Sequence, residues 1–279
     1  MIYTHTAAER SDASASRRSQ TYLRDEAMFA AGTGVAEVEI RTFTDMDLRG
    51  GTVIAAFPSV GLVSSITATY LITTMGGDQI CALESEDFPS LSMIYARKPK
   101  FPARIYALGN RVALCICEVP LPGRAHRPTG KVLLRWAQSH GCRQIVSLEG
   151  LPIEEPLKPD ESPPVWGVGS TDRARTELDK HGIKQLDAGV IAGVTGILLN
   201  EGRWLNYDVI ALLAEARPEV PDALSAVSLT QGLDMLLPEI EVDLAPLRER
   251  AKELEAHFGR LKHQAKPVVP EPLVEGMYR

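Results

Sequence analysis

The last three residues of the sequence combine chemistry that is suited to docking on a partner. Met277 is apolar, Tyr278 carries a phenol ring, and Arg279 carries the carboxylate with which the sequence ends. An apolar side chain and an aromatic ring can fill a pocket, the phenol can hydrogen-bond at its rim, and a carboxylate can pair with a buried lysine. These residues predict a partner-binding motif. The alternative is an ordinary unstructured terminus that matches the pattern by chance.

The segment before this motif supports the docking interpretation. Residues 265–276 include Pro267, Pro270 and Pro272 and have no apolar periodicity, so they cannot form a helix or a packed strand by themselves. We therefore predict a flexible tail over residues 265–279.

Glycines at expected strand-to-helix turns could serve a different chemistry. Backbone amides at Gly61 or at Gly189, Gly193 and Gly196 could hold an anion. The spacing of the last three is neither a dinucleotide fingerprint nor a P-loop, and no Lys-Ser/Thr pair follows. Close backbone packing is the commoner reason for glycine at such turns.

Two further groups of residues keep an enzymatic function open. His126 lies between Arg124 and Arg127 in a Gly-Arg-Ala-His-Arg-Pro passage, which could bind an anion but fits a solvated basic loop better. Glu149 and the pair at 154–155 could be paired carboxylates, although sequence spacing does not bring them together. No Gly-x-Ser-x-Gly elbow is present. The alternative function is therefore an enzyme of a phosphorylase-like or hydrolase-like α/β fold that acts on a small anionic substrate, and we expect no catalytic residues.

The cysteines predict neither disulfides nor a metal site. Cys115 and Cys117 are two residues apart in an apolar run and would point to one face of a strand as small buried hydrophobes, while Cys81 and Cys142 stand apart. Ligands at metal-binding spacing are missing from the sequence around them. We expect a reduced, cytoplasmic protein without cofactors.

Composition excludes several classes of protein. The chain has 279 residues, of which 44% are hydrophobic and 24% charged, which is typical of one large globular domain or two small ones. A net charge of -6 argues against nucleic-acid binding, and no apolar run is long enough to span a membrane. Residues 1–34 lack the apolar stretch of a signal peptide and are predicted to be disordered, with Met28 as a possible alternative start.

Strand and helix patterns alternate along the chain and predict a doubly wound α/β fold. Short apolar runs favour strands and three-to-four spacing favours helices. A largely parallel sheet covered by helices follows, with an antiparallel excursion that includes a tight hairpin at Gly109-Asn110. The expected strands are 52–57, 79–84, 91–96, 104–108, 112–119, 143–148, a strand from 165, a strand-to-turn passage 189–196 and 207–213; the expected helices are 60–72, 131–140, 172–180 and 197–201.

Two helices are expected to close the fold. Asp222 is predicted to cap the first, at 223–237. The second has apolar residues at heptad spacing that could pack inward or form a coil between subunits. These residues are Leu244, Leu247, Ala251, Leu254, Phe258 and Leu261.

Four passages resemble the family of the second proteasome assembly chaperone. Residues 55–66 are similar to its opening strand, Phe-Pro turn and Gly-Leu-Val helix start, although Ser59 stands where many relatives have glycine. Residues 86–90 resemble its acidic Phe-Pro turn, residues 189–199 its glycine-rich turn, and residues 222–227 its following helix. The similarity runs in order from about residue 35 to residue 261, which chance matches would not produce.

The resemblance implies a fold and a function. The family has an α/β fold like that of nucleoside phosphorylases and no established catalytic centre. Its archaeal members oligomerise, and several end in the hydrophobic-Tyr-X motif that enters pockets between 20S alpha subunits. We therefore expect a homo-oligomeric proteasome assembly chaperone or ATP-independent activator, with a disordered segment at 1–34, a family domain at 35–264 and a docking tail at 265–279.

Overall fold

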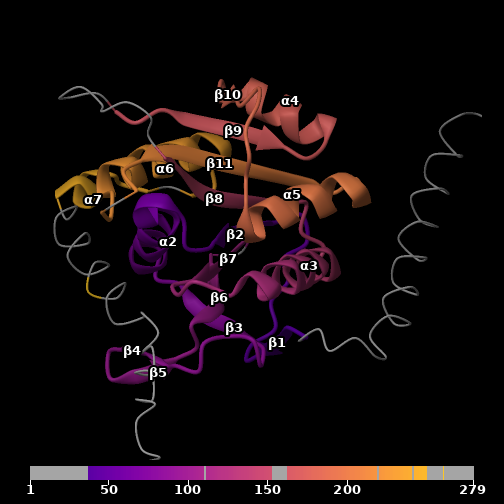
Figure 1. The fold of residues 1–279 in the computed structure, drawn as a ribbon, viewed down its shortest axis with the longest axis vertical. Helices are drawn as coiled ribbons and strands as arrows, with labels where there is room; N and C mark the ends of the chain where they lie inside the picture. Colours follow the sequence, from indigo (N-terminus) through magenta and orange to yellow (C-terminus); the bar gives the residue numbers. More distant parts are fainter. Residues whose placement is uncertain are drawn as a thin grey trace, which may run out of the picture.

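The computed structural model describes residues 37–109, 111–152, 162–218, 220–240, 242–249 and 260. Nine strands within these residues form one sheet in the order β1-β3-β6-β7-β2-β8-β11-β9-β10, with helices on both faces (Figure 1). The strands are β1 (Glu39–Thr42), β2 (Thr52–Ala56), β3 (Asp78–Glu84), β6 (Ala103–Leu108), β7 (Val112–Cys117), β8 (Gln144–Pro152), β9 (Val165–Gly169), β10 (Lys184–Gln185) and β11 (Asp208–Ala216).

Parallel pairing is concentrated at the centre of this sheet. Strands β7, β2, β8 and β11 run parallel, β6, β3 and β1 extend one side in antiparallel fashion, and β9 adds an antiparallel strand on the other. The predicted mixed, largely parallel α/β fold is confirmed, and so is the β6–β7 hairpin, in which Leu108 pairs with Val112.

The central strands are apolar because both of their faces are covered. Every residue of β2 and of β7 is buried. Successive side chains of β2 point to opposite faces of the sheet. Ile54 therefore lies in the hydrophobic core on one side, and Val53 and Ala55 lie in the core on the other.

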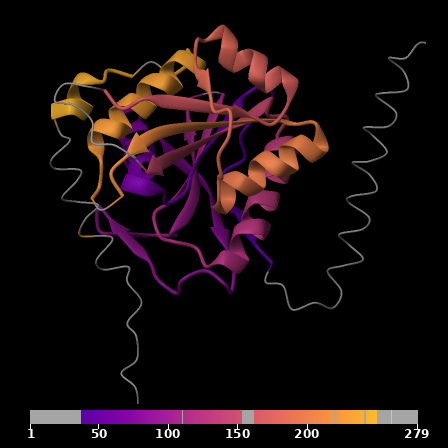
Figure 2. The same cartoon turned by 45° about the horizontal axis from the view of Figure 1, so that its top comes forward.

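Different helices cover the two faces (Figures 1 and 2). The short 3-10 turn η1 (Val60–Leu62), α2 (Val63–Thr74), α6 (Ala223–Leu236) and α7 (Ala245–Glu249) lie on the Ile54 side, where α2 packs on α6. On the other side α3 (Gly123–Ser139) packs on α5 (Gly193–Leu205). The remaining helix, α4 (Asp172–Lys180), packs beside β9 and matches its predicted range. None of the helices in the described ranges has the length and apolarity that a membrane span needs.

Several predicted boundaries are wrong, and two of them are the starts of helices. Helix α3 begins at Gly123, so the Gly-Arg-Ala-His-Arg-Pro passage forms its first turns and is not a loop, although Pro128 lies within it. Residues 189–192 form no strand, and α5 begins at Gly193 instead of residue 197. In both places tertiary packing of α3 against α5 stabilises helix where glycine and proline indicated a break.

The C-terminal elements pack inward as far as the structure describes them. Asp222 accepts a hydrogen bond from the Ser225 backbone N–H at 3.2 Å, which confirms the predicted cap of α6. Leu247 of α7 is fully buried in the core, and Leu244 packs against that core. The other predicted heptad positions, residues 251, 254, 258 and 261, lie outside the described residues, as do the N-terminal segment 1–34 and the tail 265–279.

A two-stranded hairpin, β4 (Met93–Tyr95) and β5 (Lys98–Lys100), extends beside the sheet. The Tyr95 hydroxyl donates to the Glu118 carboxylate, which also pairs with Arg104. These contacts fix the hairpin to strands β6 and β7.

Candidate functional site

The predicted docking residues Met277, Tyr278 and Arg279 lie outside the described residues. Docking through them remains a prediction. The structure does show how the chain approaches that segment: the Tyr70 hydroxyl of α2 donates to the Asp243 carbonyl, and α7 follows with Leu247 in the core.

A cleft opens at the carboxyl ends of the central strands. From β2 the chain turns into α2 and continues to β3, on the β7 side of the sheet; from β8 it continues to β9, on the β11 side. Neighbouring parallel strands whose connections leave in opposite directions form a topological switch point, where open α/β sheets commonly bind ligands. The cleft has a volume of about 470 Å³.

Two of the passages that carry the family resemblance line this cleft. Phe57 to Val60 follow β2, and Val190 to Thr195 lead into α5. The remaining walls come from the ends of β7 and β8 and from the start of α3: Pro120, Leu121, His126, Glu149, Gly150, Leu151 and Pro152. Segments far apart in the sequence therefore meet at one concave surface.

Glu149 is the carboxyl group among the described residues that line this cleft. Its Oε2 accepts a hydrogen bond from Thr195 Oγ1 at 2.9 Å, and its Oε1 accepts one from the Gly150 backbone N–H at 3.3 Å. Burial raises the pKa of Glu149 to about 7, and these two hydrogen bonds oppose the shift. The other predicted carboxylates, at 154 and 155, lie outside the described residues, so the structure does not test that pairing.

His126 and the two arginines beside it have separate partners. Arg124 pairs with Asp87 in the acidic Phe-Pro turn, and Arg127 Nη1 lies 3.6 Å from Glu201 Oε1. His126 Nε2 donates to the Leu121 carbonyl at 3.1 Å. Only His126 of the three lines the cleft, so the structure does not assemble them into an anion site.

Most of the glycines at the turns serve close packing, whereas Gly193 has φ +67° and open space around an added Cβ. Gly61 has φ +63°, and a Cβ there would lie 3.0 Å from that of Ala216. At Gly196 and Gly150 an added Cβ would lie 2.3 Å from the Ile191 carbonyl oxygen and 2.2 Å from that of Val60. Such distances leave room only for glycine and hold both walls of the cleft close to the sheet.

The four cysteines are buried free thiols. Burial raises the pKa of Cys142 to about 11 and that of Cys117 to about 12, so both remain protonated at neutral pH. Cys115 and Cys117 lie in the same core cluster, as predicted from their spacing. The described residues contain no group of three His, Cys, Asp or Glu side chains that could hold a metal ion.

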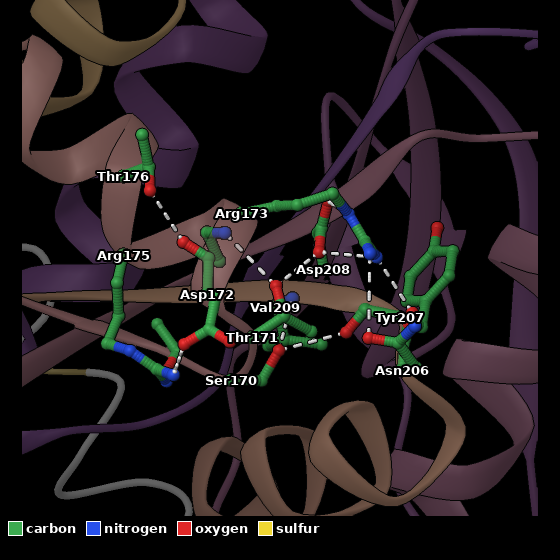
Figure 3. Close-up of polar contacts among 12 residues, drawn as sticks. Ser170, Thr171, Asp172, Arg173, Arg175, Thr176, Asn206, Tyr207, Asp208 and Val209 are labelled. Atoms are coloured by element: carbon green, nitrogen blue, oxygen red, sulfur yellow. Dashed lines mark hydrogen bonds and ion pairs between the residues drawn. The ribbon is translucent and has the colours of Figure 1, made fainter. Parts of the chain in front are cut away.

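A polar network that the sequence did not indicate joins α4 to β11 (Figure 3). Thr171 caps α4 through Ala174 N–H at 3.0 Å and donates to the Asp208 carboxylate. Arg173 Nη2 lies 3.0 Å from Asp208 Oδ1 and donates to the Asn206 carbonyl at 2.8 Å. Because these groups bond one another, we interpret the network as structural.

Comparison with known proteins agrees with this architecture. One similar solved structure is that of Pyrococcus furiosus PbaA, which is described as an archaeal homolog of proteasome-assembly chaperone. The two structures match with a TM-score of 0.74 and 27% sequence identity, and the match covers 82% of this chain and 97% of the PbaA chain. P. furiosus PbaB, described as an archaeal proteasome activator, shares the fold with a TM-score of 0.65 and 22% identity, covering 81% of this chain and 99% of its own. The uncharacterized protein MJ0106 of Methanocaldococcus jannaschii is 25% identical over 212 residues, which are 76% of this chain and 85% of that protein.

The family model that matches the chain covers nearly all of the sheet and its helices. It is described as the PAC2 family and matches residues 53–262, a range that begins in β2 and includes both passages lining the cleft. With more than half of the chain matched and the fold shared with PbaA, the chain belongs to the PAC2 family.

Proposed function

We propose that this protein is a proteasome assembly chaperone or an ATP-independent proteasome activator that docks C-terminal tails into pockets between 20S alpha subunits. The observation that carries the proposal is the match to PbaA over 97% of that chain, because PbaA is described as a homolog of proteasome-assembly chaperone. The terminal Met277-Tyr278-Arg279 supports the mode of binding, since it supplies an apolar anchor, a phenol and a carboxylate.

The tail has sufficient reach for such docking. Residues 265–276 are twelve residues, which span roughly 20 Å as a flexible coil and roughly 40 Å if the prolines hold them extended. The folded domain would then stand clear of the ring surface while the last three residues enter a pocket.

Several tails on one homo-oligomer would bind far better than one. Joining binding modules raises overall affinity by roughly 10² to 10⁴ without any new contact. Binding through tails requires neither nucleotide hydrolysis nor a catalytic centre, so we propose a non-enzymatic cytoplasmic protein. Tails that bias the ring toward an open gate would make it an activator, and tails that only hold alpha subunits together would make it an assembly chaperone.

The experiment compares the full chain with a variant that lacks residues 277–279. The full chain should co-sediment with 20S particles or with alpha rings, and the variant should remain in the supernatant at the same concentration. Equal sedimentation of the two would contradict tail docking. Light scattering should give the same particle size for both, which separates loss of docking from loss of the oligomer. Stimulated peptide hydrolysis by 20S particles would then identify an activator.

A further inference from the structure

The proposed tail docking does not involve the cleft between β2 and β8, although the walls of this cleft are well defined. Backbone carbonyl groups lie so close to Gly150 and Gly196 that there is no room for a side chain at either position. These contacts hold the end of β8 and the start of α5 in place. Most side chains that line the cleft are apolar, among them Phe57, Leu121 and Ile191. A ligand in this cleft would therefore be mainly apolar.

One polar side-chain relay ends in the cleft. Thr195 Oγ1 donates its proton to Glu149 Oε2 at 2.9 Å. Ser147 Oγ lies 2.9 Å from Thr195 Oγ1 and must donate to it, because the Thr195 proton is already committed. Glu149 Oε1, in contrast, accepts only a long 3.3 Å bond from Gly150 N–H within the described part of the chain. Oε1 is thus the oxygen that has capacity for a ligand.

The charges around Glu149 determine which ligand fits. No lysine or arginine lines the cleft within the described part of the chain, and the ring Nε2 of His126 is bonded to the Leu121 carbonyl. On the elements packed around Glu149, Glu201 of α5 pairs with Arg127 of α3, Glu215 of β11 accepts from Trp166, and Asp208 pairs with Arg173. The strand β2 and the turn η1 contain no titratable residue.

The first turn of α5 supplies hydrogen-bond donors beside this carboxyl group. Gly193 and Val194 line the cleft, and their backbone N–H groups precede the first intrahelical bond, which Gly196 N donates to Ala192 O at 3.3 Å. Ala192 at the N-cap offers no side-chain acceptor. No side chain caps these N–H donors, and they lie next to a carboxyl group that can carry a proton. Such a site suits a ligand with acceptor oxygens.

We propose that the cleft binds a small amphipathic monocarboxylate, whose apolar body contacts Phe57 and Ile191 and whose carboxylate shares one proton with Glu149. Two carboxylates in contact cannot both be ionised, so one proton must be present. Burial already raises the pKa of Glu149 to about 7, so that proton is supplied near neutral pH. A phosphate monoester would carry more charge into a cleft whose described walls contain no lysine or arginine, and it should be excluded.

The test is calorimetric titration of the full chain with 3-phenylpropionate at pH 6 and pH 8. Affinity should be about tenfold higher at pH 6, because only the protonated form of Glu149 binds. At pH 8, titration in two buffers of different ionisation enthalpy should show uptake of about 1 proton per ligand. 3-Phenylpropanamide and phenyl phosphate should not bind. Absence of 3-phenylpropionate binding at pH 6, equal affinity at the two pH values, or equal binding of either analogue would overturn the proposal.

Two variants locate the binding. Glu149→Gln keeps a donor that never ionises and should bind 3-phenylpropionate with the same affinity at pH 6 and pH 8. Glu215→Gln changes a carboxylate that does not line the cleft and should retain the native pH dependence. Retained pH dependence in Glu149→Gln would assign the proton elsewhere and overturn the proposal, and if that variant does not fold, proton uptake by the native chain decides. Deletion of residues 277–279 should leave this binding unchanged, which makes it separable from proteasome docking.

Discussion

Arg104 and Glu118 form an ion pair that is closed to solvent, with side chains 4% and 1% exposed. Arg104 also donates to the Tyr106 hydroxyl and the Phe101 carbonyl, both at 2.9 Å, and Glu118 accepts from Tyr95. Each charged group therefore has further hydrogen-bond partners besides its counter-ion, which is the condition under which a buried pair is tolerated.

Removing one partner of this pair should strongly destabilise the fold. Glu118→Ala leaves the Arg104 guanidinium buried without its counter-ion, and we expect a loss of about 3–5 kcal/mol in the free energy of unfolding. Urea denaturation followed by circular dichroism measures it. Asp47→Ala, which removes the exposed partner of Arg49, serves as the control and should leave the midpoint unchanged. A small effect of Glu118→Ala would show that water reaches the pair.

Leu247 distinguishes inward packing of α7 from a coil between subunits. The side chain is fully buried within its own chain, so Leu247→Ala should lower the free energy of unfolding by about 2–5 kcal/mol. Particle size by light scattering should stay the same. Met235→Ala, at a position 51% exposed, should change neither quantity. A smaller particle with unchanged stability would instead place Leu247 at a subunit interface.

Elements with a local signal were predictable from the sequence. The helix at 172–180 matches its prediction residue for residue, and the cap at Asp222 follows from a side chain that bonds the backbone three residues on. The start of α3 was missed because Pro128 and the surrounding glycines favour a break locally, whereas packing on α5 decides the outcome. Short edge strands such as β10 exist through their pairing partners and have little local pattern.

The cleft could be predicted only in part, because its chemistry depends on contacts distant in sequence. The glycine turns and the Phe-Pro passage were recognisable as local motifs. The partner of Glu149 is 46 residues away, and no periodicity links the two. The same holds for Thr171 and Asp208, which are 37 residues apart and meet because β9 and β11 are antiparallel neighbours.

Ionisation of Glu149 should make stability depend on pH in a defined direction. Its pKa is raised from 4.5 to about 7 in the folded state, so the folded chain holds a proton that the unfolded chain releases. The contribution of this group to the free energy of unfolding is fully present below pH 4.5. That contribution falls by about 3 kcal/mol as the pH rises to 7.

The glutamine in Glu149→Gln cannot ionise. The free energy of unfolding of this variant, relative to that of the native chain, should therefore increase by about 3 kcal/mol between pH 4.5 and pH 7. Chemical denaturation of both proteins across this range measures the difference. A constant difference would show that the carboxyl group has an ordinary pKa.

Single changes in the tail should separate the roles of the ring and the carboxylate. Tyr278→Ala removes the aromatic anchor and should cost at least about 2 kcal/mol per tail in binding to 20S particles. Arg279→Ala keeps the carboxylate in place and should be tolerated. Co-sedimentation over a range of protein concentrations compares the two with the native chain.

Appending one residue after Arg279 should impair binding nearly as much as deleting residues 277–279. The added residue moves the carboxylate about 3.5 Å along the chain from the Tyr278 ring, so it no longer reaches the lysine of a partly desolvated pocket, and leaving that lysine unpaired is unfavourable. If the extended chain binds and stimulates 20S particles as well as the native chain while Tyr278→Ala does not, the ring alone carries the docking. The position of the carboxylate would then be irrelevant, and the similarity to proteasome-docking termini would not reflect a shared mechanism.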